Sequence, residues 1–157
     1  MCGIGLAPAS FLNKEQKINV LVLGTGAGLL TMFIQSQLKD HLSKLDTIDN
    51  NPAMLKVAET QFGFKPAKFT KSHVADAMTC VNGLASGFYN LICMDINYEE
   101  GNSQISPPFK FMAPEYISRL LALLRDGGLL TFNIICYDKL LLEKAVEMLK
   151  ATAGEEV

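Results

Sequence analysis

The pattern of apolar and polar positions along the chain predicts five strands, each followed by a helix. The predicted strands lie at 18–23, 45–49, 69–75, 88–95 and 129–136; the first is an apolar run rich in β-branched residues, and the fourth is almost continuously apolar. Segments with apolar residues at helical spacing follow them, at 29–39, 52–62, 77–84, 114–126 and 137–150. This regular succession of strand and helix predicts an α/β domain with a doubly wound, mainly parallel sheet and helices on both faces. Ligands of such domains bind beyond the carboxyl ends of the strands.

The first predicted strand ends in a glycine-rich loop, Gly24-Thr25-Gly26-Ala27-Gly28. Glycines let the backbone approach a ligand closely, and the free N–H groups that open the next helix attract anionic groups. The dinucleotide fingerprint requires its third glycine where this chain has Leu29, and the phosphate-binding P-loop requires a lysine that is missing here. An adenosyl ligand with a small carboxylate tail fits better, which points to S-adenosylmethionine. The alternative is a glycine-rich turn that binds nothing.

Carboxylates follow the second and third predicted strands. Asp49 lies 21 residues after Gly28, where it can accept hydrogen bonds from both hydroxyls of a ribose. Asp76 can accept a hydrogen bond from an adenine amino group, with Ala77 beside the ring. For both aspartates the alternative is a local role, as a loop residue or as the N-cap of the helix that follows.

Asp95 ends the fourth predicted strand, which is almost entirely apolar. We expect its carboxylate to lie beside the transferred group, to orient an amine nucleophile and to take its proton. The alternative is an aspartate that only ends the strand. Asn97 and Tyr98, in the irregular segment 96–112, are candidate substrate contacts or else ordinary loop residues.

Composition narrows the classes of partner. The 157 residues are 49% hydrophobic and 19% charged, as expected for one globular domain. A net charge of −2 with scattered lysines offers no basic surface for nucleic acid. The first ten residues do not form a targeting or membrane-spanning segment, so we expect no membrane association. Four cysteines without a CxxC pair, and two histidines without ligand-like spacing, predict free thiols, no metal site and a cytoplasmic protein.

Four motifs in succession resemble those of class I S-adenosylmethionine-dependent methyltransferases, and most closely the spermidine-synthase-like branch. They are VLGTGAG at 22–28, TIDNNPAML at 47–55, VADA at 74–77 and YNLICMD at 89–95. Together with segments 61–64, 107–109 and 130–136, the pattern is similar to the C-terminal domain of the dual methyltransferases that modify translation elongation factor 1-alpha. The similarity extends over roughly residues 3–150.

The resemblance implies a Rossmann-like methyltransferase fold, S-adenosylmethionine as cofactor and a protein substrate. The amine would be an N-terminus or a lysine of a translation elongation factor. By resemblance, the glycines would face the methionine part of the cofactor, and the adenosine would lie along the acidic strand ends. The predicted cofactor site comprises Gly24, Thr25, Gly26, Gly28, Asp49, Asn50, Asp76 and Ala77, and Asp95 would face the reacting amine.

Two departures from the branch leave alternatives open. Polyamine synthases have an aspartate where this chain has Ala27, and a different segment follows their catalytic aspartate, so aminopropyl transfer is the less favoured enzyme reaction. Family members also continue into an antiparallel strand pair beside strand five and have more residues before position 1. We therefore expect residues 1–157 to be one domain truncated at both ends, lacking that pair, with a partner or missing segment covering the apolar edge of strand five. A catalytically inactive or partner-dependent cofactor-binding module is the third alternative.

Overall fold

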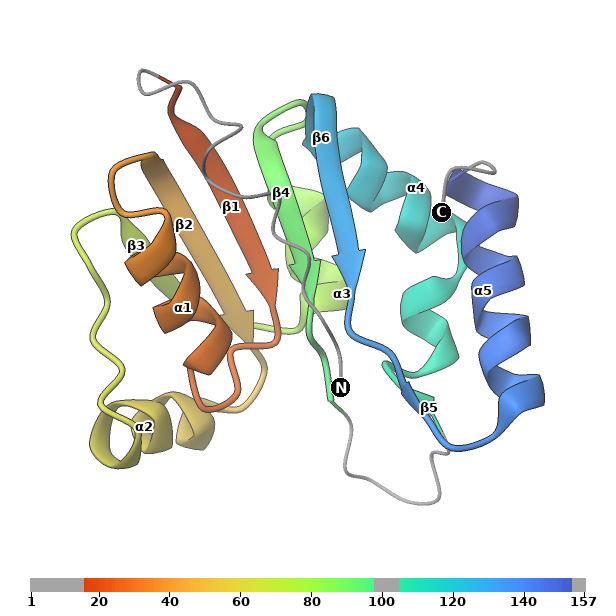
Figure 1. Cartoon of the computed structure of the whole chain (residues 1–157), viewed down its shortest axis with the longest axis horizontal. Coiled ribbons are helices and arrows are strands. Elements are labelled where there is room, and N and C mark those ends of the chain that lie inside the picture. The colour runs from red at the N-terminus through yellow and green to blue at the C-terminus, as the bar shows by residue number, and fades with distance from the viewer. Residues whose placement is uncertain (1–15, 98–104, 154–157) are drawn as a thin grey trace.

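The computed structural model describes residues 16–97 and 105–153, and its centre is a five-stranded parallel sheet of order β3-β2-β1-β4-β6 (Figure 1). The strands of this sheet are β1 (Ile18–Leu23), β2 (Leu42–Asp49), β3 (Thr70–Val74), β4 (Tyr89–Met94) and β6 (Leu124–Phe132). The helices are α1 (Leu29–Gln37), α2 (Pro52–Gln61), α3 (Ala77–Cys80), α4 (Pro114–Leu123) and α5 (Lys139–Ala153), with 3-10 turns η2 (Val81–Gly83) and η3 (Phe109–Met112). The predicted doubly wound α/β fold is confirmed.

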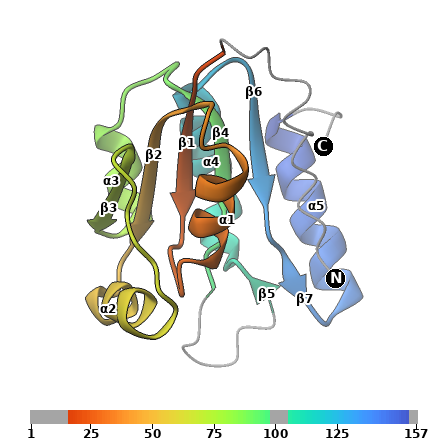
Figure 2. The same cartoon turned by 60° about the vertical axis from the view of Figure 1, so that its left-hand side comes forward.

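Helices cover both faces of the sheet, which explains the continuous apolar strands. In Figure 2, α1 lies in front of the sheet and α4 behind it. On the α1 face, Ile34 packs with Val20, Val22 and other strand residues. On the opposite face, α3 and α4 cover a larger cluster that includes Leu21 and Leu23. Because both faces are buried, residues 20–23 have no exposed surface.

Helix α4 ends earlier than the sequence predicts. We expected it to continue to Asp126, but it stops at Leu123 and β6 begins at Leu124. The physical reason is tertiary: the backbone N–H groups of Gly87 and Phe88 donate to the last carbonyls of the helix, at Ala122 and Leu123. Residues 125–128 then bulge out of the ladder before Leu129 pairs with Leu91.

The predicted fifth strand, 129–136, is also divided. After Phe132 the chain leaves the sheet, and β7 (Ile135–Cys136) pairs antiparallel with β5 (Ile105–Ser106). The segment 96–112, predicted to be irregular, therefore contains a short strand and η3 in its described part. Helix α5 covers this region by packing on α4.

Strand β6 lies at the edge of the sheet and, within the described residues, pairs with β4 alone. Leu129 on this strand remains exposed. Cover for it by a partner or a further segment stays a prediction.

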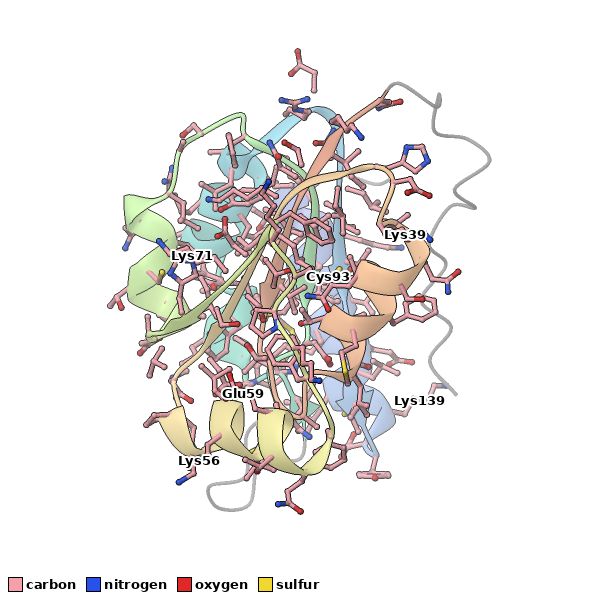
Figure 3. The ribbon with its side chains drawn as sticks, turned by 90° about the vertical axis from the view of Figure 1, so that its left-hand side faces the viewer. Lys39, Lys56, Glu59, Lys71, Cys93 and Lys139 are labelled. Atoms are coloured by element: carbon pink, nitrogen blue, oxygen red, sulfur yellow. The ribbon has the colours of Figure 1, made fainter. Side chains whose placement is uncertain are left out.

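Several lysines lie at the periphery of the described part of the molecule. Figure 3 shows Lys39, Lys56 and Lys139 at the periphery on α1, α2 and α5 or next to them, whereas Cys93 lies among the strands. No helix within 16–97 and 105–153 is long and apolar enough to cross a membrane. In the same residues no group of three His, Cys, Asp or Glu side chains is placed to hold a metal ion.

A buried carboxylate, which the sequence pattern did not single out, connects β2, β3 and β4. Asp46 is 1% exposed and accepts hydrogen bonds from Tyr89 Oη at 2.8 Å, His73 Nε2 at 3.0 Å and Lys44 Nζ at 2.6 Å. Burial acts to raise the pKa of Asp46, but these three partners outweigh it and hold the pKa below its usual value. Burial and the Asp46 charge together raise the pKa of Tyr89, which therefore stays a donor.

We expect Tyr89→Phe to destabilise the fold by about 1.5–3 kcal/mol, the range for a hydrogen bond to a charged group. The matched control is Tyr116→Phe, because the Tyr116 hydroxyl donates to the neutral Ala77 carbonyl at 3.3 Å. That change should cost about 1 kcal/mol. Urea unfolding at neutral pH measures both, and equal losses would contradict the charge-assisted bond.

The same network predicts an acid dependence of stability. Since the pKa of Asp46 is lower in the folded than in the unfolded chain, its ionised form stabilises the fold above the unfolded pKa. This contribution is lost as the pH falls through the folded-state pKa. Tyr89→Phe removes one of the lowering bonds, so unfolding of that variant should depend less steeply on acid than unfolding of the wild type.

Candidate functional site

The carboxyl ends of the strands lie at one edge of the sheet, where the arrowheads of β1, β2 and β4 meet in Figure 1. Backbone hydrogen bonds continue past the strand ends and place the following residues. Gly24 N–H donates to the Ile48 carbonyl at 2.8 Å, and Asp95 N–H donates to the Leu23 carbonyl at 2.8 Å. The glycine loop, the end of β2 and Asp95 are therefore neighbours, as the strand pattern predicted.

The three glycines of the loop serve different purposes. A Cβ atom on Gly24 would lie 2.2 Å from the Asp95 carbonyl oxygen, and one on Gly28 would lie 3.0 Å from the Phe64 ring. At these two positions only glycine fits, because the Asp95 backbone and the Phe64 ring occupy the space of a Cβ atom. Gly26 has φ +50°, and a Cβ atom there would meet nothing within 4 Å. Of the three glycines, Gly26 is therefore the one whose surroundings are open to a ligand.

Asp49 contacts the glycine loop directly. Its Oδ2 accepts hydrogen bonds from the N–H groups of Thr25 at 3.1 Å and Gly26 at 2.9 Å, and its Oδ1 accepts from Asn51 at 2.9 Å. The Asp49 carboxylate therefore orders the loop, and its contact with a ribose stays a prediction. Asn50 beside it is exposed.

Thr25 presents only its backbone to this edge. Its side chain is 5% exposed and its Oγ1 lies 2.6 Å from Oγ1 of Thr47, inside the protein. A contact between Thr25 and a cofactor would therefore use the backbone.

We expect Asp49→Ala to weaken S-adenosylmethionine binding by about 1–3 kcal/mol, because it leaves hydrogen-bonding groups of both ribose and loop unpaired. Asp40→Ala is the matched control, since it removes an exposed carboxylate with the same change of charge. Calorimetric titration of each variant gives the dissociation constant. An affinity unchanged from wild type in Asp49→Ala would contradict the ribose assignment.

The structure gives less support to the predicted adenine contact of Asp76 and Ala77. Asp76 is the N-cap of α3, because its Oδ1 accepts the N–H of Met78 at 2.7 Å. The local alternative weighed for this residue is therefore realised, and it leaves Oδ2 available to an adenine. The Ala77 side chain is buried in the core. The adenine contact of these two residues stays a prediction.

Asp95 follows β4 and is partly buried. Burial raises the pKa of its carboxyl above the usual value, while a hydrogen bond from Asn133 Nδ2 at 2.8 Å acts in the opposite direction. A raised pKa brings a carboxylate closer to the range in which it can accept and release protons near neutral pH. The position and environment of Asp95 thus fit the role predicted for it.

The predicted substrate residues are placed less completely. Asn97 is exposed, and its Oδ1 accepts a hydrogen bond from Ser106 Oγ at 2.8 Å. Tyr98 lies outside the described residues. Sequence reasoning missed Asn133, although a polar residue in the apolar run 129–136 was a signal that could have identified it.

Comparisons with known proteins identify relatives of similar sequence. No protein-family model matches the chain. The chain is 29% identical to the proteins named eEF1A lysine and N-terminal methyltransferase of Mus musculus and Homo sapiens, with 96% of the chain and 22% of each relative covered. It thus spans about a fifth of the length of these relatives. It is also 25% identical to the polyamine aminopropyltransferase of Vibrio vulnificus, over 84% of the chain and 42% of that protein.

Solved structures show the same relationship. Human methyltransferase-like protein 13 in complex with SAH superposes with a TM-score of 0.80 at 27% identity, covering 93% of this chain and 67% of that one. The spermidine synthase of Thermotoga maritima, at 14% identity and a TM-score of 0.71, covers 88% of this chain and 46% of its own and shares the fold. The resemblance predicted from the motifs is confirmed: the chain has the Rossmann-like fold of class I S-adenosylmethionine-dependent methyltransferases, and its curated relatives include methyltransferases of eEF1A.

Proposed function

We propose that this domain is an S-adenosylmethionine-dependent protein N-methyltransferase that acts on an amine of eEF1A. The observation that carries the proposal is the arrangement at the carboxyl edge, where Asp49 orders an open glycine loop and Asp95 lies next to that loop. The names of the curated relatives support both the reaction and the substrate. Either an N-terminal amine or a lysine fits this site.

The residues present fit the cofactor. The positive φ and open surroundings of Gly26 leave room for a ligand at the loop, and Asp49 has the acceptor oxygens that a ribose requires. Gly24 and Gly28 let the loop pack closely against Asp95 and Phe64, because neither has a Cβ atom. When bound, S-adenosylmethionine supplies a methyl group whose bond to sulfur breaks as the bond to nitrogen forms, with the electron pair left on sulfur. The task of the chain is to position the amine, which accounts for much of the rate of such displacements.

In this proposal Asp95 accepts a hydrogen bond from the amine and turns its lone pair toward the methyl group. The amine must be neutral to react, and the carboxylate takes up the proton that leaves the nitrogen before passing it to water. The ionised form of Asp95 is the active one. Activity should therefore fall as the pH drops through the raised pKa of Asp95.

Aminopropyl transfer to a polyamine is the second candidate, favoured by the similarity to the Vibrio vulnificus enzyme. Ala27 argues against it, because polyamine synthases have an aspartate at this place in the loop. Decarboxylated S-adenosylmethionine with putrescine as acceptor tests this reaction. A catalytically inactive or partner-dependent module remains the third candidate.

Calorimetric titration of the purified chain with S-adenosylmethionine, with NAD as control ligand, is the first test. We expect saturable binding of S-adenosylmethionine alone. Peptides of eEF1A with a free N-terminal amine or a free lysine are then assayed for methyl transfer by mass spectrometry. Absence of binding by the folded chain would favour the partner-dependent module, and binding without methyl transfer would leave only a cofactor-binding role.

A further inference from the structure

Asn133 is the neighbour of Asp95 across the sheet. In the β4–β6 ladder Cys93 lies opposite Thr131 and Met94 lies opposite Phe132, so Asp95 and Asn133 form the next opposed pair. The backbone confirms this register, because Asn133 N–H donates to the Met94 carbonyl at 2.9 Å. Opposed residues of neighbouring strands direct their side chains to the same face. Asn133 thus reaches the same point of the carboxyl edge as Asp95.

The Asn133 amide is oriented by the carboxylate. Its Nδ2 donates to Asp95 Oδ1 at 2.8 Å, and the opposite orientation would bring two oxygens together. The amide oxygen Oδ1 therefore points away from that bond. This oxygen is buried and has no hydrogen-bond partner in residues 16–97 and 105–153. An unpaired buried acceptor is unfavourable, and a donor brought by a ligand would relieve it.

We propose that Asn133 is a second amine-binding residue, whose Oδ1 accepts one N–H of the substrate while the Asp95 carboxylate accepts another. This inference rests on the proposed function and assigns the residues that would recognise a primary amine in it. A primary amine retains two N–H groups in its neutral form, one for each acceptor, whereas a hydroxyl or thiol has a single hydrogen. Two hydrogen bonds also fix the rotation of the amine, which a single carboxylate does not.

The test measures amine binding without turnover. The chain, saturated with S-adenosylhomocysteine, is titrated with butylammonium and with trimethylbutylammonium, and the carboxyl carbon of Asp95 is followed by NMR. The two probes have the same charge, but only the first has N–H groups. We expect wild type to favour butylammonium, which can donate to both acceptors. Asn133→Leu should lower this preference by about fivefold, the contribution of a hydrogen bond of ordinary strength, and raise the pKa of Asp95 further.

Two variants separate binding from folding. Asn133→Gln keeps both an amide donor for Asp95 and an acceptor oxygen, and should retain part of the preference for butylammonium. Thr131→Val, two residues earlier on β6, removes a weak hydroxyl contact with the Ile92 carbonyl at 3.4 Å and should leave the preference unchanged. Equal weakening of both probes in Asn133→Leu would overturn the amine contact and leave Asn133 as a residue that only positions Asp95. A wild-type Asp95 signal that responds to neither probe would overturn the amine site itself, and with it the proposed function.

Discussion

Asp95→Asn should lower methyl transfer by at least about 100-fold, the lower bound for losing a positioned proton acceptor. The substitution keeps the shape of the side chain and an oxygen that can accept from Asn133 Nδ2, so the fold and the register of β4 and β6 should persist. It removes the negative charge that attracts the amine and the base that takes its proton. Initial rates on an eEF1A peptide, with calorimetric titration of S-adenosylmethionine alongside, measure the two effects separately.

Cofactor affinity should stay within about twofold of wild type in Asp95→Asn, because Asp95 faces the amine and the loop is ordered by Asp49 instead. Asp40→Asn is the control and should leave the rate unchanged. It neutralises an exposed carboxylate that precedes β2, whereas the site lies beyond the carboxyl ends of the strands. Full turnover by Asp95→Asn would remove Asp95 from the chemistry. A parallel loss of cofactor binding would instead assign Asp95 to the cofactor.

The pH profile of the wild type checks the same assignment. Burial favours the protonated form of Asp95, so the carboxylate becomes available only above a raised pKa. The rate should rise with pH through that pKa, and this rise should be missing from the residual activity of Asp95→Asn. If the rise persisted unchanged in the variant, it would reflect deprotonation of the substrate amine and not of Asp95.

Much of the fold and of the candidate site could be predicted because both follow from local patterns. Apolar runs without alternation indicate strands buried on both faces, and parallel strands end at one edge. Asp49, Asp76 and Asp95 end predicted strands or directly follow them, so their common location needed no knowledge of side-chain contacts. The glycine spacing likewise placed the open loop between β1 and α1.

The rest depends on tertiary hydrogen bonds that no local pattern encodes. Helix α4 ends at Leu123 because residues on another segment donate to its last carbonyls, although the glycine pair at 127–128 looks like its natural stop. Asp46 is buried because Lys44, His73 and Tyr89 converge on it from three strands. Asn133 contacts Asp95 through the register of β6 against β4, which the sequence does not specify.

Gly24→Ala and Gly26→Ala add the same methyl group but should affect different properties, the stability of the fold in the first and the affinity for cofactor in the second. The Cβ atom of Gly24→Ala would lie 2.2 Å from the Asp95 carbonyl oxygen, on backbone with φ +96°. Since both contacting groups are backbone, the end of β4 must move, and we expect a loss of about 3 kcal/mol or more in the free energy of unfolding. Urea unfolding of the purified variant measures it.

Gly26→Ala should fold nearly normally but bind cofactor poorly. Its φ of +50° lies in the left-handed region, which costs about 1–2 kcal/mol for a residue with a Cβ atom, and its methyl group meets no protein atom within 4 Å. That open space is where the ligand is expected, so S-adenosylmethionine affinity should fall by more than about tenfold, equivalent to 1.4 kcal/mol. If Gly26→Ala bound S-adenosylmethionine like wild type, the ligand would not approach the loop at Gly26. If Gly24→Ala were as stable as wild type, the close contact between the loop and Asp95 would be wrong.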